Sequence, residues 1–447
     1  MTSPPASTTD PALEPIRAKV LAGERLTLED GLALYRTRDL FTLGELANEV
    51  RERLHGRRAY YNINRHINYT NYCVLRCKFC SFYRPYEPAR THAADMPAPP
   101  AARPARGGSL PILHGAEPRA ASEAASRSDA YELSVDEVLA LAAEAAARGA
   151  TEVHIVGGLH PRLPFSYYTD LCRAIKARCP TLHIKAFTAI EIVHFTRIAR
   201  PRRTIHEVLT ELRDAGLDSL PGGGAEIFDD RVHDEAFKSK VGEQHWFDVH
   251  SAAHELGIPS NATMLYGHVE TLAERVQHLL KLRAHQDVSL RERRAAFQCF
   301  VPLSFIPDGS ALAHLPGPTG LDDLRTLAVA RLMLDNIPHL KAFWVMQSPK
   351  LSQVALNWGV DDFDGTVVWY DITRREGRGT NRQELSVDQI RRLLREAGCE
   401  PVERDTLYRP VRRAARQGLV PGSATKGCRS GLGLGAGADE DGPGERG

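Results

Sequence analysis

Short apolar, β-branched runs alternate with longer segments of helical periodicity from about residue 60 to residue 400. In the longer segments apolar residues recur every three to four positions, as in amphipathic helices, and several of these segments end at a glycine. The short runs predict eight strands, at residues 66–71, 152–157, 182–188, 217–222, 260–267, 297–303, 340–346 and 365–370. Each predicted strand is followed by a helical segment, so the pattern predicts an α/β fold whose parallel strands close into a TIM-type (β/α)8 barrel. Because 217–222 and 365–370 are weak strand patterns, a partial (β/α)6 barrel is the alternative.

The pattern divides the chain into three parts. Residues 1–57 read as short N-terminal helices, residues 58–410 as the barrel, and residues 411–447 as a disordered, Gly-rich tail. Residues 87–130 are rich in Ala, Pro, Arg and Ser without periodicity, which predicts a disordered insertion within the barrel.

Composition and charge limit the class of protein. The chain has 447 residues, 43% hydrophobic and 25% charged, with a formal net charge of +1. That balance favours neither nucleic-acid nor membrane binding. No apolar run approaches the roughly 20 residues of a membrane helix, and residues 1–15 lack the pattern of a secretory signal. We therefore expect a cytoplasmic protein.

Three of the eight cysteines, Cys73, Cys77 and Cys80, form a C-x3-C-x2-C pattern directly after the first predicted strand. Active sites of parallel barrels lie at the carboxyl ends of the strands, where this loop falls. No second C-x2-C or H-x3-H follows, so two zinc hairpins are not indicated. Three thiolates from one loop can instead bind three irons of a cubic cluster and leave the fourth iron open to a small molecule. A three-thiol zinc site in a non-catalytic scaffold, completed by a distant histidine, is the alternative.

This motif, with the aromatic Phe79 before its last cysteine, resembles the signature of the radical S-adenosylmethionine (SAM) superfamily. The resemblance implies a [4Fe-4S] cluster held by the three cysteines, with SAM bound at the open iron. It also implies that Gly157 and Gly158 direct backbone carbonyls to the SAM amino group, although Leu159 replaces the Glu that often follows.

Two further positions are predicted to bind SAM. Glu226, in the glycine-rich turn "LPGGGAEIF", is a candidate to accept hydrogen bonds from the ribose hydroxyls. Tyr266, at the end of the fifth predicted strand, lies where the superfamily places contacts to adenine.

Candidate substrate residues come from the strand pattern and from charge. His66 and Asn68 share one face of the first predicted strand, because alternate residues of a strand point the same way. Arg84, Lys185 and His268 are further candidates, as cationic or hydrogen-bonding groups for the acidic substrate that the family resemblance described next implies.

Longer blocks, among them "HIVGGLHPRLPFSYY", "KAFTAIEIVHF" and "AGLDSLPGGGAEIF", resemble the aminofutalosine synthase family of the futalosine route to menaquinone. The resemblance implies addition of the 5′-deoxyadenosyl radical to the enolpyruvyl double bond of 3-[(1-carboxyvinyl)oxy]benzoate, giving 6-amino-6-deoxyfutalosine. SAM would be consumed as a co-substrate, and an electron donor such as flavodoxin or ferredoxin would be required. The cyclic dehypoxanthine futalosine synthases of the same route, which share the cysteine loop and the GGGAE turn, are the alternative. The sequence singles out no proton-transfer residue.

Overall fold

The computed structural model describes residues 10–86, 130–367 and 383–413. Residues up to Val411 belong to one compact unit, and a second unit begins at Arg412. The predicted insertion, apart from residue 130, and the predicted tail from residue 414 onward lie outside the described residues.

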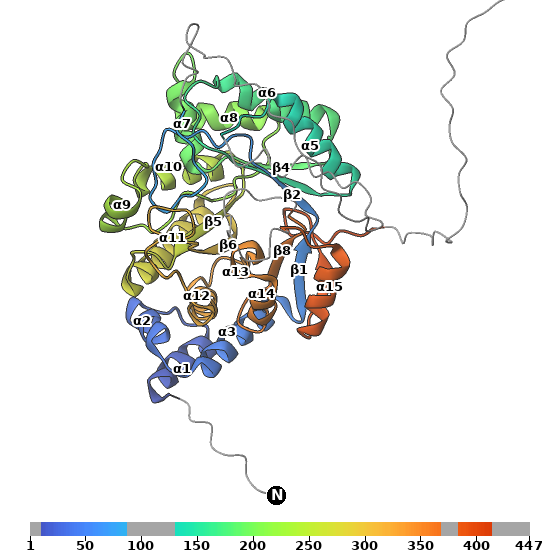
Figure 1. Cartoon of the computed structure of the whole chain (residues 1–447). Coiled ribbons are helices and arrows are strands. Elements are labelled where there is room, and N and C mark those ends of the chain that lie inside the picture. The colour runs from blue at the N-terminus through green and yellow to red at the C-terminus, as the bar shows by residue number, and fades with distance from the viewer. Residues whose placement is uncertain (1–9, 87–129, 368–382, 414–447) are drawn as a thin grey trace, which may run out of the picture. The chain divides into compact units, whose positions relative to one another are not determined.

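A ring of parallel strands forms the centre of the compact unit (Figure 1). Its strands are β1 (Arg58–Asn62), β2 (Asn64–Ile67), β3 (Glu152–Ile155), β4 (His183–Ala186), β5 (Ser260–Tyr266), β6 (Phe297–Ser304), β7 (His339–Leu340) and β8 (Asp362–Gly365). Three sheets, β2-β3-β4, β5-β6-β7 and β8-β1-β9, are joined by parallel bridges at Lys185–Ser219, Leu220–Ser260 and Lys341–Asp362. Because β1 runs almost directly into β2, these pairings close the ring, and the predicted TIM-type barrel is confirmed.

The first strand differs from its prediction. It begins at Arg58 and ends at Ile67, whereas the sequence pattern placed it at residues 66–71. Its first half pairs with β8 on one side and on the other with β9 (Glu400–Glu403), a C-terminal strand that the hydrophobic pattern did not predict. Its second half pairs with β3. The weak fourth strand is reduced to isolated bridges at Ser219 and Leu220.

Helices flank the ring, and most of them cover its outside. They are α5 (Val135–Ala147), α6 (Phe165–Arg178), α7 (Ala189–Ile198), α8 (Ile205–Ala215), α9 (Asp230–Ala236), α10 (Glu243–Glu255), α11 (Leu272–Glu292), α12 (Gly320–Met333), α13 (Trp344–Gln347), α14 (Pro349–Ala355) and α15 (Val387–Glu396). Many begin with a Ser or Thr cap whose hydroxyl accepts a hydrogen bond from the third helical residue, as the sequence pattern of their first turns predicts. Within the described ranges no helix has both the length and the apolar character of a membrane span.

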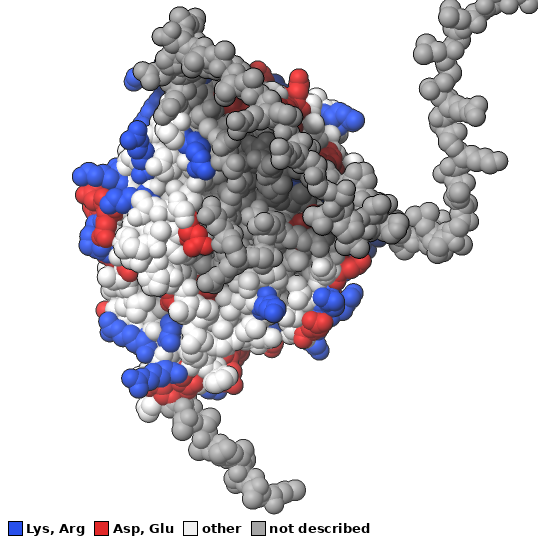
Figure 2. Space-filling model, viewed as in Figure 1, with Lys and Arg blue, Asp and Glu red and all other residues white. Residues whose placement is uncertain are grey.

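The predicted N-terminal helices are present as the short η1 (Pro11–Leu13), α1 (Glu14–Ala22), α2 (Leu28–Arg36) and α3 (Leu40–His55). They pack against α11 and α12 of the barrel, at the bottom of the view in Figure 1. Their buried side chains belong to the same apolar core as those of the barrel. Figure 2 shows charged side chains of both signs interspersed around the visible face, in keeping with the small net charge.

Candidate active site

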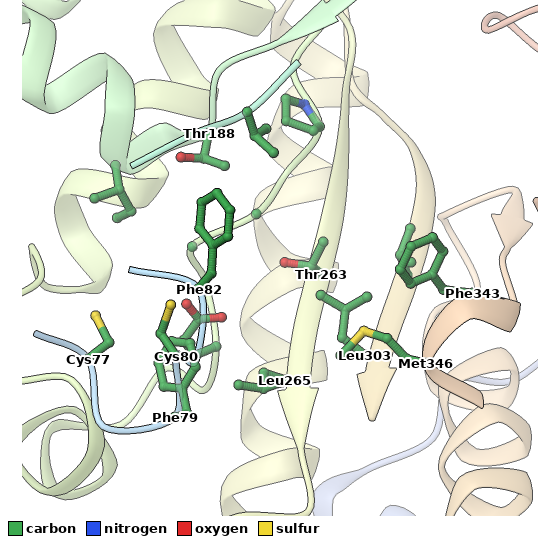
Figure 3. A pocket seen from close by; sticks show the side chains of 18 of the residues that line it. Cys77, Phe79, Cys80, Phe82, Thr188, Thr263, Leu265, Leu303, Phe343 and Met346 are labelled. Atoms are coloured by element: carbon green, nitrogen blue, oxygen red, sulfur yellow. The ribbon is translucent and has the colours of Figure 1, made fainter. Parts of the chain in front are cut away.

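A cavity of about 270 Å³ lies inside the barrel, between the cysteine loop and the inner faces of the strands. Figure 3 shows Cys77 and Cys80 on one side of the cavity and Phe343 and Met346 on the other, with Thr263 and Leu265 of β5 between them. The lining is largely apolar, with a few charged and polar groups. This arrangement is typical of a small-molecule site.

All three cysteines of the motif line this cavity, and none forms a disulfide. The loop that carries them is held by backbone hydrogen bonds along its length. The Cys73 amide donates to the carbonyl of Arg84 at 3.0 Å, and the Lys78 amide donates to the carbonyl of Ala236 at 2.9 Å. The Cys80 amide donates to the carbonyl of Cys77 at 3.1 Å, which forms the tight turn between the last two thiols. The thiols are therefore fixed on one short, anchored segment.

The paired glycines after β3 lie directly against this loop. A β-carbon on Gly158 would lie 2.2 Å from the carbonyl oxygen of Tyr72, and one on Gly157 would lie 2.7 Å from the ring of Tyr69. Both distances are far below van der Waals contact, so only glycine fits. Both residues also line the cavity. The pair allows the cysteine loop to pack onto the end of β3, a role that the sequence motif did not reveal.

The donor set fits an iron–sulfur cluster. Burial raises the pKa of Cys77 to about 12, and the nearby Lys240 ammonium opposes that rise. Thiols in such a place become ligands when a metal replaces their protons, and a neighbouring cation stabilises the anionic cluster. Three thiols on one loop leave one iron of a cube without a protein ligand, which fits the predicted binding of a small molecule there.

Glu226 lies on the cavity wall in a strained conformation. Its φ of +46° is in the left-handed region, which costs a residue with a side chain about 1–2 kcal/mol. Its carboxylate forms an ion pair with the buried Lys240, whose ammonium lies 5.1 Å from the centre of the Phe79 ring. Both partners and Phe79 line the cavity. The strain is therefore located where the sequence predicted ribose binding.

Glu191, which the sequence analysis missed, joins the ends of three adjacent strands. Its Oε1 accepts hydrogen bonds from the hydroxyl of Tyr69 at 2.7 Å and from the amide of Gly157 at 3.1 Å. Its Oε2 accepts from the amide and hydroxyl of Thr188, at 2.7 and 2.8 Å. Burial raises the pKa of Glu191 to about 7, against the opposing effect of these donors. The capping-box spacing Thr188-x-x-Glu191 was a sequence signal for the helix start, but it did not reveal the contacts to Tyr69 and Gly157.

Four of the predicted site residues do not line the cavity. The Asn68 side chain donates to the carbonyl of Val156 at 3.0 Å, because the strand ends at Ile67 and its alternation stops there. The Arg84 guanidinium donates to the carbonyls of Ser81 and Tyr83 and so closes the cysteine loop. The imidazole of His268 lies within 3.0 Å of the carbonyl of Leu265, with its side chain fully buried.

Tyr266 is the fourth, and strand geometry explains its position. On β5 the side chains of Asn261, Thr263 and Leu265 line the cavity, so the alternate residues face the surrounding helices. Accordingly the Tyr266 hydroxyl donates to Asp323 of α12 at 2.6 Å. The remaining predicted residues, His66, Phe79, Gly157, Gly158, Lys185, Glu226 and the three cysteines, all line the cavity. Side chains that line it but were not predicted include His154, Lys240, Lys341, Phe343, Met346 and Asp364.

A TIM-type barrel with a three-cysteine loop at the carboxyl ends of its strands defines a radical SAM enzyme, and the chain belongs to that superfamily. The family model described as "Radical SAM superfamily" matches residues 67–282, and one described as "CofH/MqnC C-terminal region" matches residues 294–417. A [4Fe-4S] cluster and SAM are accordingly the cofactors of this enzyme.

Named relatives include two enzymes of the futalosine route to menaquinone. They also include the 5-amino-6-(D-ribitylamino)uracil--L-tyrosine 4-hydroxyphenyl transferase of Methanopyrus kandleri, which is 34% identical and covers 85% of this chain and 92% of the relative. The chain is 46% identical over 408 residues to aminodeoxyfutalosine synthase of Thermus thermophilus, covering 90% of this chain and 97% of the relative. It is 39% identical to aminodeoxyfutalosine synthase of Streptomyces coelicolor, covering 89% of this chain and 93% of the relative. It is 29% identical to cyclic dehypoxanthine futalosine synthase of Halalkalibacterium halodurans, covering 90% and 95%.

Solved structures agree in fold. Methylornithine synthase matches with a TM-score of 0.60 at 16% identity, covering 86% of this chain and 97% of that one. The FeFe-hydrogenase maturase of Carboxydothermus hydrogenoformans matches with a TM-score of 0.60 at 17% identity, covering 89% and 80%.

Proposed function

We propose that the chain is an aminodeoxyfutalosine synthase, which joins the 5′-deoxyadenosyl group of SAM to 3-[(1-carboxyvinyl)oxy]benzoate. The products are 6-amino-6-deoxyfutalosine and methionine, and the carboxylate of the enolpyruvyl group is lost. The observation that carries the proposal is the 46% identity to a protein of that name across 97% of its length. The cavity supports it, because it places the three cysteines beside an apolar space inside the barrel.

In this proposal Cys73, Cys77 and Cys80 hold the cluster. When bound and reduced, the cluster supplies the electron that cleaves SAM to the 5′-deoxyadenosyl radical. Glu226, held by Lys240, binds the ribose hydroxyls, and the segment at Gly157 and Gly158 borders the methionine end.

The apolar side chains Val301, Leu303, Phe343 and Met346 form the part of the wall that excludes water. Such a wall favours radical addition, because a primary radical is otherwise quenched by solvent or by side chains, and because positioning two reactants lowers the barrier. No proton-transfer residue is required of these side chains.

The remaining expectations belong to the same proposal. A flavodoxin or ferredoxin would deliver the electron in the cytoplasm. Cyclic dehypoxanthine futalosine synthase is the second candidate, and the model of the CofH/MqnC C-terminal region favours keeping it. Its lower identity, 29% against 46%, places it behind the first.

Anaerobic reconstitution with iron and sulfide, followed by dithionite, SAM and 3-[(1-carboxyvinyl)oxy]benzoate, tests the proposal by mass spectrometry. We expect 6-amino-6-deoxyfutalosine from the native enzyme and none from the Cys73→Ala variant. If methionine and 5′-deoxyadenosine form alone, and dehypoxanthine futalosine is consumed in a parallel assay, the second candidate replaces the first. An intact cluster that cleaves no SAM would contradict both.

A further inference from the structure

The deepest part of the cavity carries a group of charged and imidazole side chains from different strands. We call this group the floor and define it as His66, His154, Lys185, Lys341 and Asp364, all of which line the cavity. His66, Lys185 and Asp364 lie within β2, β4 and β8, and Lys341 directly follows β7. The cysteines lie on a loop beyond the strand ends. The floor and the cysteine loop are therefore at opposite depths of one cavity.

Each lysine of the floor is held by one carboxylate. The Lys185 ammonium lies 2.9 Å from Glu152, and the Lys341 ammonium donates to Asp364 at 2.7 Å. An ammonium group has three N–H donors, so one carboxylate partner does not saturate it. Glu152 does not line the cavity, so its charge lies behind Lys185. Among the described residues, the side chains of the floor that line the cavity carry two ammonium groups and one carboxylate, that of Asp364.

The two imidazoles of the floor add neutral hydrogen-bonding groups. The rings of His66 and His154 lie 4.2 Å apart between centroids. Burial lowers the pKa of His66 to about 4, so its ring is neutral near pH 7. The floor is thus a buried polar pocket that holds two ammonium groups, each paired with one carboxylate, and two imidazoles. Such a pocket is suited to an anion that leaves water, because buried charge-assisted hydrogen bonds are strong.

The substrate of the proposed function carries two carboxylates, and the chemistry assigns them to different depths. One is bonded to the alkene that reacts and must stay beside the adenosyl carbon, near the cysteine loop. The other lies across the aromatic ring and is free to reach away from the reaction. The apolar Leu303, Phe343 and Met346, which Figure 3 shows grouped on one wall, offer a surface on which an aromatic ring can pack, and the Phe343 ring lies 5.9 Å from that of His66.

We propose that the floor is the binding site for an aromatic carboxylate, with Lys185 and Lys341 as the cations that receive it. The site fixes the ring of the substrate and thereby places the alkene. This inference rests on the proposed function for the identity of the substrate. The pocket itself is defined by residues of this chain, so its binding can be tested apart from turnover.

The first measurement is binding of 3-hydroxybenzoate to the reconstituted enzyme by isothermal titration calorimetry, with phenol as the probe that lacks the carboxylate. The Lys341→Met/Asp364→Asn double variant removes both charges of one pair, so that it leaves no unpaired buried carboxylate. Lys350→Met, at an exposed position of α14, is the matched control. We expect the double variant to weaken 3-hydroxybenzoate binding at least 30-fold and the control to leave it within twofold. If the double variant binds 3-hydroxybenzoate as tightly as the native enzyme and melts at the same temperature, the floor is not the carboxylate site.

Turnover separates this inference from the proposed function. With 3-[(1-carboxyvinyl)oxy]benzoate, the double variant Lys185→Met/Glu152→Gln, which leaves no unpaired buried carboxylate, should lower kcat/KM at least 30-fold. With the phenol enolpyruvyl ether, which lacks the ring carboxylate, the same variant should change kcat/KM less than threefold. Native enzyme that makes no 6-amino-6-deoxyfutalosine, yet binds 3-hydroxybenzoate through the floor, would refute the function and retain the site. Native enzyme that makes the product, with Lys185→Met/Glu152→Gln equally impaired on both ethers, would retain the function and refute the site.

Discussion

At the scale of single residues, some functional positions can be recognised from their spacing in the sequence. Others are distinguished only by the direction in which their side chains point. The three cysteines and the glycine pair after β3 could be predicted because their spacing and residue type are distinctive. Leu265 and Tyr266 could not be told apart, because every residue of β5 is buried on one face or the other and its pattern does not alternate. Only the structure shows that Leu265 faces the cavity and Tyr266 faces α12. The strained turn at Glu226 was visible as a glycine-rich run, but its partner Lys240 was not.

Glu191 gives a prediction at this scale. In Glu191→Gln an amide replaces an oxygen that faces donors from Tyr69 and Gly157 or from Thr188, so at least one donor loses its acceptor. We expect the free energy of unfolding to fall by about 2 kcal/mol and SAM binding to weaken at least fivefold, because the glycine pair and Thr188 border the cavity. Denaturant unfolding and anaerobic titration calorimetry measure the two effects.

The control for Glu191 is Glu207→Gln, which alters the same capping-box position at the exposed start of α8. It should destabilise the chain less than Glu191→Gln does and leave SAM binding unchanged. If Glu191→Gln loses stability but binds SAM like the native enzyme, the carboxylate serves the helix cap alone.

At the scale of elements, the helices and the strands β3, β5 and β6 followed the hydrophobic periodicity closely, while β7 and the seam of the barrel did not. The run predicted as a strand at residues 340–346 is a strand only at its start and becomes α13 at Trp344. The pattern missed β9, whose residues Glu400–Glu403 are largely polar and partly exposed, so it carries no apolar run. It shifted the first strand because the buried residues in the middle of β1 and β2, from Asn62 to His66, are largely polar and break the apolar pattern. Hydrophobic periodicity reflects the burial of apolar side chains. The seam, where β1 meets β8 and β9, is held by ionic contacts, which produce no hydrophobic pattern.

Arg404, which directly follows β9, supplies the test at this scale. Its guanidinium donates to the fully buried Asp362 of β8 at 2.9 and 2.5 Å. Arg404→Met leaves that carboxylate without its main cation, so we expect a loss of about 3–5 kcal/mol in the free energy of unfolding. Arg409→Met removes an exposed pair with Asp405 and should cost at most about 1 kcal/mol. Similar losses in both variants, measured by urea unfolding, would show that the seam does not depend on the buried pair.

At the scale of the whole molecule, neutral buried histidines couple folding to pH. His250 and His254 of α10 and His278 and His285 of α11 lie in the layer between these helices and the barrel. Burial lowers the pKa of His254 and His278 to about 3 and that of His285 to about 4, and it lowers the pKa of His250 strongly. Each therefore stays neutral in the folded chain at pH values where the unfolded chain takes up a proton.

The sign of the pH effect follows from these shifts. Below about pH 6.5 the unfolded state binds more protons, so stability falls as pH falls, by about 2 kcal/mol per histidine between pH 7.5 and pH 5. Urea unfolding across that range should show this slope, and His254→Gln should reduce it by about one proton. His206→Gln, at an exposed position of α8, should leave the slope unchanged. A flat profile for the native protein would contradict the prediction.

The pairing of β1 with β8 and β9 also determines when the barrel can close during synthesis of the chain. The cysteine loop leaves the ribosome early, but the strand that precedes it pairs with residues 362–365 and 400–403, more than 300 residues later in the chain. The backbone amide of Lys78 likewise forms its hydrogen bond only once Ala236 has been made, and the Lys78 carbonyl accepts from the amide of Ala311, which comes later still. Because a chain grows from its N-terminus and long-range pairing is slow, the barrel closes only after residues 400–403 have been synthesised. The loop that carries the three thiols is therefore fully anchored only after Ala236, Ala311 and β9 have been synthesised.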